Sequence, residues 1–281
     1  MRLSKQTLGL AALALALTSA TASLAAEPAR QRLAVPLSDP TRPAHVEVSL
    51  VMGGITVVGG GAANEVVIEA AARSDDDDEP GEVDPSRQGM KRIPNQGFGL
   101  EAEEKDNRVS VTSESWRQPL DLKITVPTAS SLVLSTVNGG GLEVEGVEGE
   151  LELHNTNGEI TVRGARGPVS AATVNGDVTV AFGRSGAAAA AMAFSTLNGD
   201  VQVTLPAAFA ADVRLRSDNG EIFSDFEIAL DQGKPEIEEK RSGGKYRLVL
   251  SREMTGKIGG GGPELLLKTF NGDIVLRRLG I

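Results

Sequence analysis

The chain has 281 residues, a formal net charge of −10, two His and no Cys, and only 3% of its residues are aromatic. The acidic balance argues against nucleic acid or an anionic membrane as partner, because both require clustered Lys and Arg. The lack of Cys excludes disulfides and a lipid-anchoring Cys, and with no close His pair we expect no metal site and no cofactor.

The first 25 residues have the pattern of a secretory signal peptide. Arg2 and Lys5 form a basic start, residues 8–17 are a short apolar run, and small residues follow as a cleavage site. The run is too short to span a bilayer comfortably, although an uncleaved anchor helix is the alternative. We therefore predict a periplasmic or secreted chain with no membrane span after cleavage, and an N-terminal linker over residues 26–44.

Residues 45–281 are predicted to form one β-repeat domain. Alternating apolar residues at 46–50 and 55–57, around Gly53 and Gly54, indicate a degenerate first rung that Val66, Ile68 and Ala70 continue. Residues 74–95 combine an acidic run with several Pro and Gly, which predicts a solvated loop. This loop lacks the ligand and Gly spacing of an EF-hand, so no Ca²⁺ site is assigned to it.

Another alternating strand is predicted at residues 120–126, before Pro127, and it leads into a repeat. Six times the chain has Ser, Thr or Asn, any residue, then Asn-Gly, closely followed by an apolar-x-apolar pair. The six Asn residues are Asn138, Asn157, Asn175, Asn198, Asn219 and Asn271, and the first five are spaced by 19, 18, 23 and 21 residues. A period near twenty indicates one small structural unit that is stacked along the molecule.

Each unit reads as two short strands with one buried face. Before the first Asn-Gly, Leu132, Leu134 and Thr136 alternate with other residues, so in a strand their side chains point to one face. After the second Asn-Gly, Ile160 and Val162 alternate with polar residues in the same way. Gly-rich corners connect successive units, because Gly tolerates the positive φ of tight corners.

Two architectures fit this pattern. Asn-Gly between alternating strands also favours a type I′ hairpin, which would give an antiparallel β-meander. However, Thr or Ser returns two places before most of the Asn residues, and stacked rungs explain this by placing Thr over Thr and Asn over Asn in hydrogen-bonded ladders. We therefore predict an all-β fold, a single-stranded β-helix or β-solenoid of about eight short rungs, with the antiparallel β-meander as the alternative.

Residues 228–262 are predicted as an insertion before the last repeat. Within it, residues 232–244 are polar and predict a loop, residues 247–250 predict a strand, and residues 256–262 predict a glycine-rich corner. The corner lacks the GxxxxGK[ST] order and the following helix of a phosphate-binding loop.

One column of the repeat carries carboxylates directly after Asn-Gly. These residues are Glu159, Asp177, Asp200, Glu221 and Asp273. Stacking would place them in a row, which we predict as an interaction edge; a row of this kind could bind Ca²⁺ or act as a general acid/base pair on a polysaccharide. The simpler interpretation is that exposed acids keep the edge soluble. An acid/base pair needs two unlike carboxylates, so no catalytic residue is assigned and no enzymatic activity is predicted.

The T-x-N-G-[DE]-[IV]-x-[VL] repeats, the ITVVG segment at Ile55, the LKITVP segment at Leu122 and the closing TFNGDIVL resemble bacterial DUF4097 proteins. The resemblance covers residues 46–276 and implies a single-stranded β-helix with an envelope or surface role, in a family of candidate adhesins. It transfers no catalytic residues.

From the residues and this resemblance, we predict an exported, non-enzymatic β-repeat protein of the bacterial envelope. Its role would be adhesin-like binding, with an envelope protein or a glycan as partner, or purely structural. The alternative is a β-helical carbohydrate-active enzyme that uses surface carboxylates.

Overall fold

The structure, a computed structural model, describes residues 30–73, 99–113, 119–184, 190–231, 237–242, 245–250 and 253–280. The predicted signal peptide (1–25) and acidic loop (74–95) lie outside the described residues. The strands before the repeats are β1 (Arg30–Pro36), β2 (His45–Met52), β3 (Ile55–Gly59), β4 (Glu65–Ala72), β5 (Leu100–Lys105), β6 (Arg108–Ser113) and β7 (Leu120–Val126).

The first four repeats contain β8 (Ser131–Asn138), β9 (Leu142–Glu145), β10 (Leu151–Asn155), β11 (Ile160–Ala165), β12 (Val169–Ala172), β13 (Val178–Phe182), β14 (Met192–Asn198) and β15 (Val201–Leu205). The C-terminal part contains β16 (Ala211–Asn219), β17 (Ile222–Ser224), β18 (Ala229–Leu230), β19 (Ile237–Ser242), β20 (Lys245–Leu250), β21 (Met254–Ile258), β22 (Glu264–Asn271) and β23 (Ile274–Arg278).

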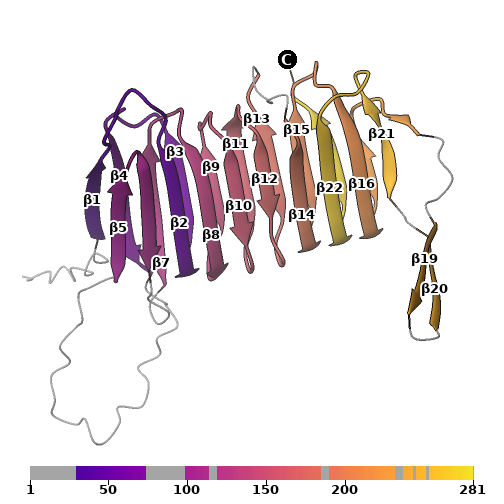
Figure 1. The fold of residues 1–281 in the computed structure, drawn as a ribbon, viewed down its shortest axis with the longest axis horizontal. Helices are drawn as coiled ribbons and strands as arrows, with labels where there is room; N and C mark the ends of the chain where they lie inside the picture. Colours follow the sequence, from indigo (N-terminus) through magenta and orange to yellow (C-terminus); the bar gives the residue numbers. More distant parts are fainter. Residues whose placement is uncertain are drawn as a thin grey trace, which may run out of the picture.

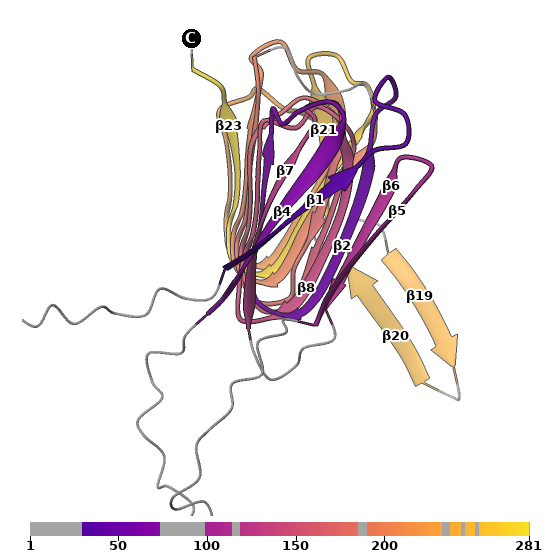
Figure 2. The same ribbon diagram turned by 90° about the vertical axis from the view of Figure 1, so that its left-hand side faces the viewer.

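Two large sheets face each other along the length of the molecule (Figures 1 and 2). Sheet A has the strand order β1-β4-β7-β3-β9-β11-β13-β15-β23-β17, and sheet B has the order β18-β21-β16-β22-β14-β12-β10-β8-β2-β6-β5. Each rung contributes one strand to each sheet. Neighbouring repeats pair in parallel, for example Leu151 with Val169 and Ile160 with Val178. The predicted β-solenoid is therefore confirmed, and the antiparallel meander is wrong.

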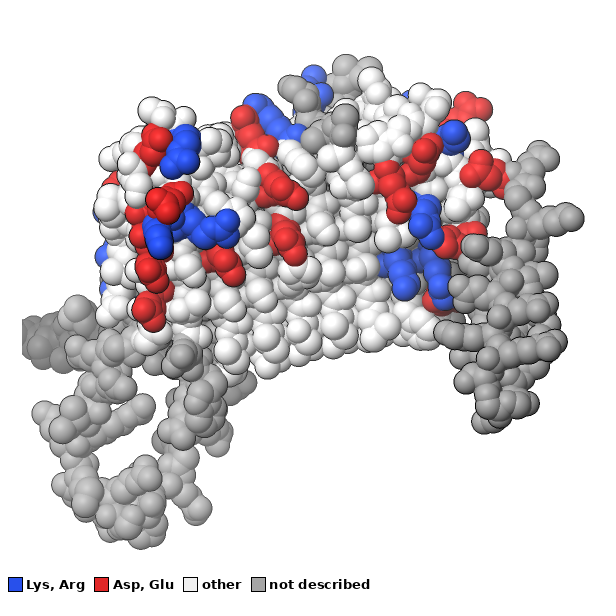
Figure 3. Space-filling model, viewed as in Figure 1, with Lys and Arg blue, Asp and Glu red and all other residues white. Residues whose placement is uncertain are grey.

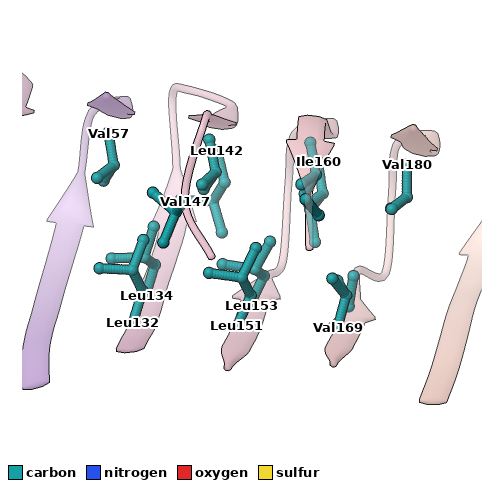
Figure 4. Close-up of a cluster of buried hydrophobic side chains, with 14 of the residues drawn as sticks. Val57, Leu132, Leu134, Leu142, Val147, Leu151, Leu153, Ile160, Val169 and Val180 are labelled. Atoms are coloured by element: carbon teal, nitrogen blue, oxygen red, sulfur yellow. The ribbon is translucent and has the colours of Figure 1, made fainter. Parts of the chain in front are cut away.

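The core lies between the sheets and consists mainly of aliphatic side chains, with Phe182 and Phe194 as its largest fully buried residues. Leu132 and Leu134 of β8 lie beside Leu151 and Leu153 of β10, facing Ile160 and others from sheet A (Figure 4). These residues have the inward parity that the alternation predicts, because successive side chains in a strand point to opposite faces. Each such buried side chain contributes about 1.5–3 kcal/mol of transfer free energy.

The rungs do not stack in chain order at either end. The first rung, β2 with β3, lies between β6–β7 and β8–β9, and the last, β22 with β23, lies between β14–β15 and β16–β17. From one end, the order is β6–β7, β2–β3, β8–β9, β10–β11, β12–β13, β14–β15, β22–β23 and β16–β17. Both terminal rungs of the chain are therefore paired on both sides.

Antiparallel strands cover the ends of the stack. At one end, β4 pairs with β7, β1 with β4, and β5 with β6; at the other end, β21 pairs with β16. The prediction that Val66, Ile68 and Ala70 continue the first rung is wrong, because their strand reverses direction to form a cap. Alternation has the same period in either direction, so it does not reveal the reversal. Residues 30–36, predicted within the linker, form β1.

A two-residue turn joins β5 and β6. Asp106 and Asn107 have φ values of 54° and 64°, as a type I′ turn requires. Glu104 accepts hydrogen bonds from the Ser38 hydroxyl at 2.7 Å and from the Asn107 N–H at 2.9 Å. The bond from Ser38, followed by that from Asn107, holds the pKa of Glu104 below its usual range. These contacts fix the N-terminal cap to the segment before β2.

The insertion contains more strand than its composition predicts. β19 and β20 pair antiparallel as a separate two-stranded sheet, so the predicted loop is wrong for residues 237–242, and the predicted strand at residues 247–250 is confirmed. Residues 256–258 belong to β21, and the glycine-rich corner begins at Gly259. β21 forms there because its residues continue sheet B beside β16 and bury Ile258.

Candidate functional site

The Asn-Gly corners align along one long edge of the stack and form a continuous ladder of side-chain amides. Each Nδ2 donates to the Oδ1 of the neighbouring rung: Asn157 to Asn138, Asn175 to Asn157, Asn198 to Asn175 and Asn271 to Asn198 at 2.7 Å, and Asn219 to Asn271 at 2.9 Å. The predicted Asn-over-Asn ladder is confirmed. The ladder follows the spatial order of the rungs, so Asn271 of β22 lies between Asn198 of β14 and Asn219 of β16.

The inward residue two places before each Asn does not join the amide ladder but donates a hydrogen bond to a backbone carbonyl of the neighbouring corner. Thr173 Oγ1 donates to the Gly158 carbonyl at 3.0 Å, and Thr196 Oγ1 donates to the Gly176 carbonyl at 2.8 Å. The same bond recurs from Thr136, Thr269 and Ser217 to the Gly of the adjoining rung. A buried carbonyl needs a partner, which explains why this position returns as Thr or Ser.

Asn155 occupies this position with a poorer fit, which leads to a stability prediction. Its Nδ2 donates to the Gly140 carbonyl at 3.0 Å, but its buried Oδ1 has no hydrogen-bond partner. Thr would keep the donor and remove the orphan acceptor, so we expect Asn155→Thr to raise the free energy of unfolding by about 1 kcal/mol in urea denaturation. The reverse exchange, Thr173→Asn, should lower it by a similar amount. A destabilised Asn155→Thr variant would contradict this account.

The predicted acidic residues do lie in one row beside the amide ladder, in the spatial order Glu159, Asp177, Asp200, Asp273 and Glu221. The three Asp side chains link neighbouring rungs. The Oδ1 atoms of Asp177, Asp200 and Asp273 accept the backbone N–H groups of Asp200, Asp273 and Glu221, each at 2.8 Å. Each Asp thus keeps its second oxygen for another partner. The use of this row as an interaction edge stays a prediction.

On the sheet B side of the ladder runs a column of exposed apolar side chains that sequence reasoning missed. Val137, Val174, Leu197 and Phe270 are 39%, 39%, 46% and 45% exposed. They occupy the position between Thr and Asn, which the repeat pattern leaves open to any residue although it is apolar in four of six repeats. Thr156 fills the rung between Val137 and Val174. Figure 3 shows an uncharged band along this lower edge of sheet B.

Charged side chains lie above this band and come closest to the lower edge toward the ends of the stack (Figure 3). At one end, Arg214 Nε donates to Glu253 Oε1 at 2.6 Å, and this bond holds the pKa of Glu253 below its usual range. At the other end, a groove of about 560 Å³ lies over β1, β4 and β7, lined by Arg32, Glu69 and Lys123 among others. Arg32 pairs with Glu69 there at 3.7 Å. The middle of the lower edge thus carries fewer charged side chains than the two ends of the stack (Figure 3).

Other candidate groups form no recognisable site. His154 lies on the outer face of sheet B, where its Nε2 contacts Glu152 Oε1 at 2.9 Å. Across the residues that the structure describes, no three His, Cys, Asp or Glu side chains are arranged to hold a metal ion. Within the same residues there is no helix with the length and hydropathy to cross a membrane.

Comparisons with known proteins identify similar chains. A family model described as Toastrack DUF4097 matches residues 107–277. A candidate cell-adhesion protein of Clostridium sporogenes is 10% identical, with a TM-score of 0.44 over 90% of this chain and 100% of that one. A candidate adhesin of Bacteroides fragilis is 11% identical, with a TM-score of 0.29 over 88% of this chain and 97% of that one. A search of curated proteins finds no match.

Proposed function

The chain belongs to the Toastrack DUF4097 family, and we propose on this basis that it is an exported, non-enzymatic protein of the bacterial envelope with an adhesin-like binding role. The basic and then apolar leader in residues 1–25 supports export. The formal net charge of −10 favours a partner other than a polyanion.

The observation that carries a binding role is the repetition along the Asn-Gly edge. Three neighbouring rungs, those of β12, β14 and β22, present the same groups: an exposed apolar side chain, an amide and a carboxylate. Such a surface offers equivalent subsites to an extended partner. In contrast, general acid/base catalysis requires two carboxylates whose surroundings differ. Asp177 and Asp200 make the same hydrogen bond, because each accepts the backbone N–H of the next rung.

The test of export and binding uses the full-length chain in its native host. A photo-reactive amino acid replaces the exposed Leu197 on the edge and, in a matched control, the exposed Phe223 on β17. We expect the leader to be removed near residue 25 and envelope adducts to form from position 197. An intact leader on a chain that stays inside the cell would overturn the proposal.

The non-enzymatic part has its own measurement. We expect no release of reducing ends when the purified chain is incubated with polysaccharides of the envelope. If release occurs and is lost in the double variant Asp177→Asn with Asp200→Asn, while circular dichroism is unchanged, the carbohydrate-active alternative is correct.

A further inference from the structure

We propose that the Asn-Gly edge binds a linear, uncharged polysaccharide that lies along the stack axis. The site is the corner strip, which we define as the residue before the ladder Asn, an exposed apolar side chain or the half-buried Thr156, together with that Asn in five neighbouring rungs. The strip runs from Val137 and Asn138 on β8 to Phe270 and Asn271 on β22. The inference rests on the proposed binding function and names its ligand class.

The amide ladder supplies matched polar groups for such a ligand. A side-chain amide has two N–H donors and two acceptor lone pairs. In Asn175, the ladder uses one donor toward Asn157 and one lone pair toward Asn198. One N–H and one lone pair therefore remain at each inner rung, on an exposed residue. A sugar hydroxyl, which both donates and accepts, fits this pair.

The apolar column supplies contact for the C–H faces of sugar rings. Leu197 and Phe270 are nearly half exposed on neighbouring rungs, and Val174 lies on the next one. A contiguous exposed apolar strip beside polar groups is typical of an interaction site, whereas single exposed apolar residues need no explanation. The regular row, and not any one side chain, points to a ligand.

Charge favours an uncharged ligand. None of the side chains of the corner strip is charged, and the adjoining row carries Asp177, Asp200 and Asp273. The second oxygens of these carboxylates can accept ligand hydroxyls, but their negative charge would repel a polyanionic chain. At the far end, Asp218 replaces the apolar residue on β16 and closes the strip.

The dimensions favour a polysaccharide over a protein. Five rungs at about 4.8 Å make a strip about 20 Å long, and its two-residue width is below about 10 Å. This area is far smaller than the roughly 800 Å² per partner of a standard protein interface, which argues against a second copy. An extended peptide advances about 3.3 Å per residue and would fall out of step with the rungs, whereas a sugar ring is about as long as one rung is high.

The experiment uses purified mature chain and titration calorimetry with three probes: cellohexaose, chitohexaose and the anionic hexamer of galacturonic acid. We expect at least one neutral hexamer to bind, its dimer to bind more weakly, and the anionic hexamer not to bind. The double variant Leu197→Asp with Phe270→Asp should weaken binding by about tenfold or more, which corresponds to about 1.4 kcal/mol of lost contact.

The matched control is Phe223→Asp, which adds a charge at an exposed apolar residue outside the strip and should leave binding unchanged. Thermal unfolding confirms that each variant is folded. The proposal is overturned if neither neutral hexamer binds at millimolar concentration, if the anionic hexamer binds as tightly, or if the control loses binding equally. These results are distinct from those for export and cross-linking in the envelope, which test the proposed function itself.

Discussion

Replacing Val178 with Asp is expected to lower the free energy of unfolding by about 3–5 kcal/mol, or to abolish cooperative unfolding, because the change buries an unpaired charge. Val178 is fully buried in β13, whose neighbours β11 and β15 cover it on both sides within sheet A. No cation of the described core is available to pair with the new carboxylate, because the core cluster is entirely apolar. Urea denaturation followed by circular dichroism measures the loss.

The adjoining Thr179 provides the matched control. It points to the outer face of the same strand and is partly exposed, so Thr179→Asp should change the free energy of unfolding by less than about 1 kcal/mol. The two variants carry the same new charge in the same rung and differ only in the face on which it lies. A loss below about 1 kcal/mol for Val178→Asp would show that the inward face has been assigned incorrectly.

The parts of the fold that could be predicted depend on local periodicity. Alternation identified Val178 and Val180 as inward, and the return of Thr before Asn favoured parallel stacking over hairpins, because only stacked rungs bring equal positions together. The order of the rungs could not be predicted in this way. Thr269 and Asn271 of β22 align equally well with Thr196 and Asn198 on one side and with Ser217 and Asn219 on the other. Every register is equivalent, so the repeat carries no information about order.

The candidate site also has a part that could be predicted from the sequence and a part that could not. The carboxylate row and the amide ladder could be predicted, since each is one column of the repeat. The apolar column was missed because it falls between two recognisable residues, and its exposure depends on which way the chain turns at the corner. The alternation would place Leu197 on the outer face but does not tell how much of it neighbouring rungs cover. Only the stacked structure shows that nearly half of it stays accessible.

In the inner Asn-Gly corners, the Gly is expected to be as sensitive to substitution as a core residue, because the neighbouring rung approaches it closely. Gly199 has a φ of 148°, and a Cβ added there would lie 2.2 Å from the Gly176 carbonyl oxygen of the neighbouring rung. Both the backbone conformation and the contact with rigid backbone are unfavourable. We therefore expect Gly199→Ala to lower the free energy of unfolding by about 3 kcal/mol or more, measured by urea denaturation.

Gly60 separates these two causes. Its φ of 99° also lies outside the left-handed α region and favours glycine, but no atom lies within 4 Å of an added Cβ, so Gly60→Ala should cost only about 1–2 kcal/mol. If Gly199→Ala costs no more than this control, close approach of the rungs is not what requires Gly at the corner. If it costs more, the same contact explains the Gly at 158, 176 and 272, where an added Cβ would also meet a neighbouring Gly carbonyl at 2.0–2.4 Å. The corner Gly then sets the rung contact that brings the ladder amides within 2.7 Å of one another, so the stability of the stack and the polar half of the proposed polysaccharide site depend on the same residue.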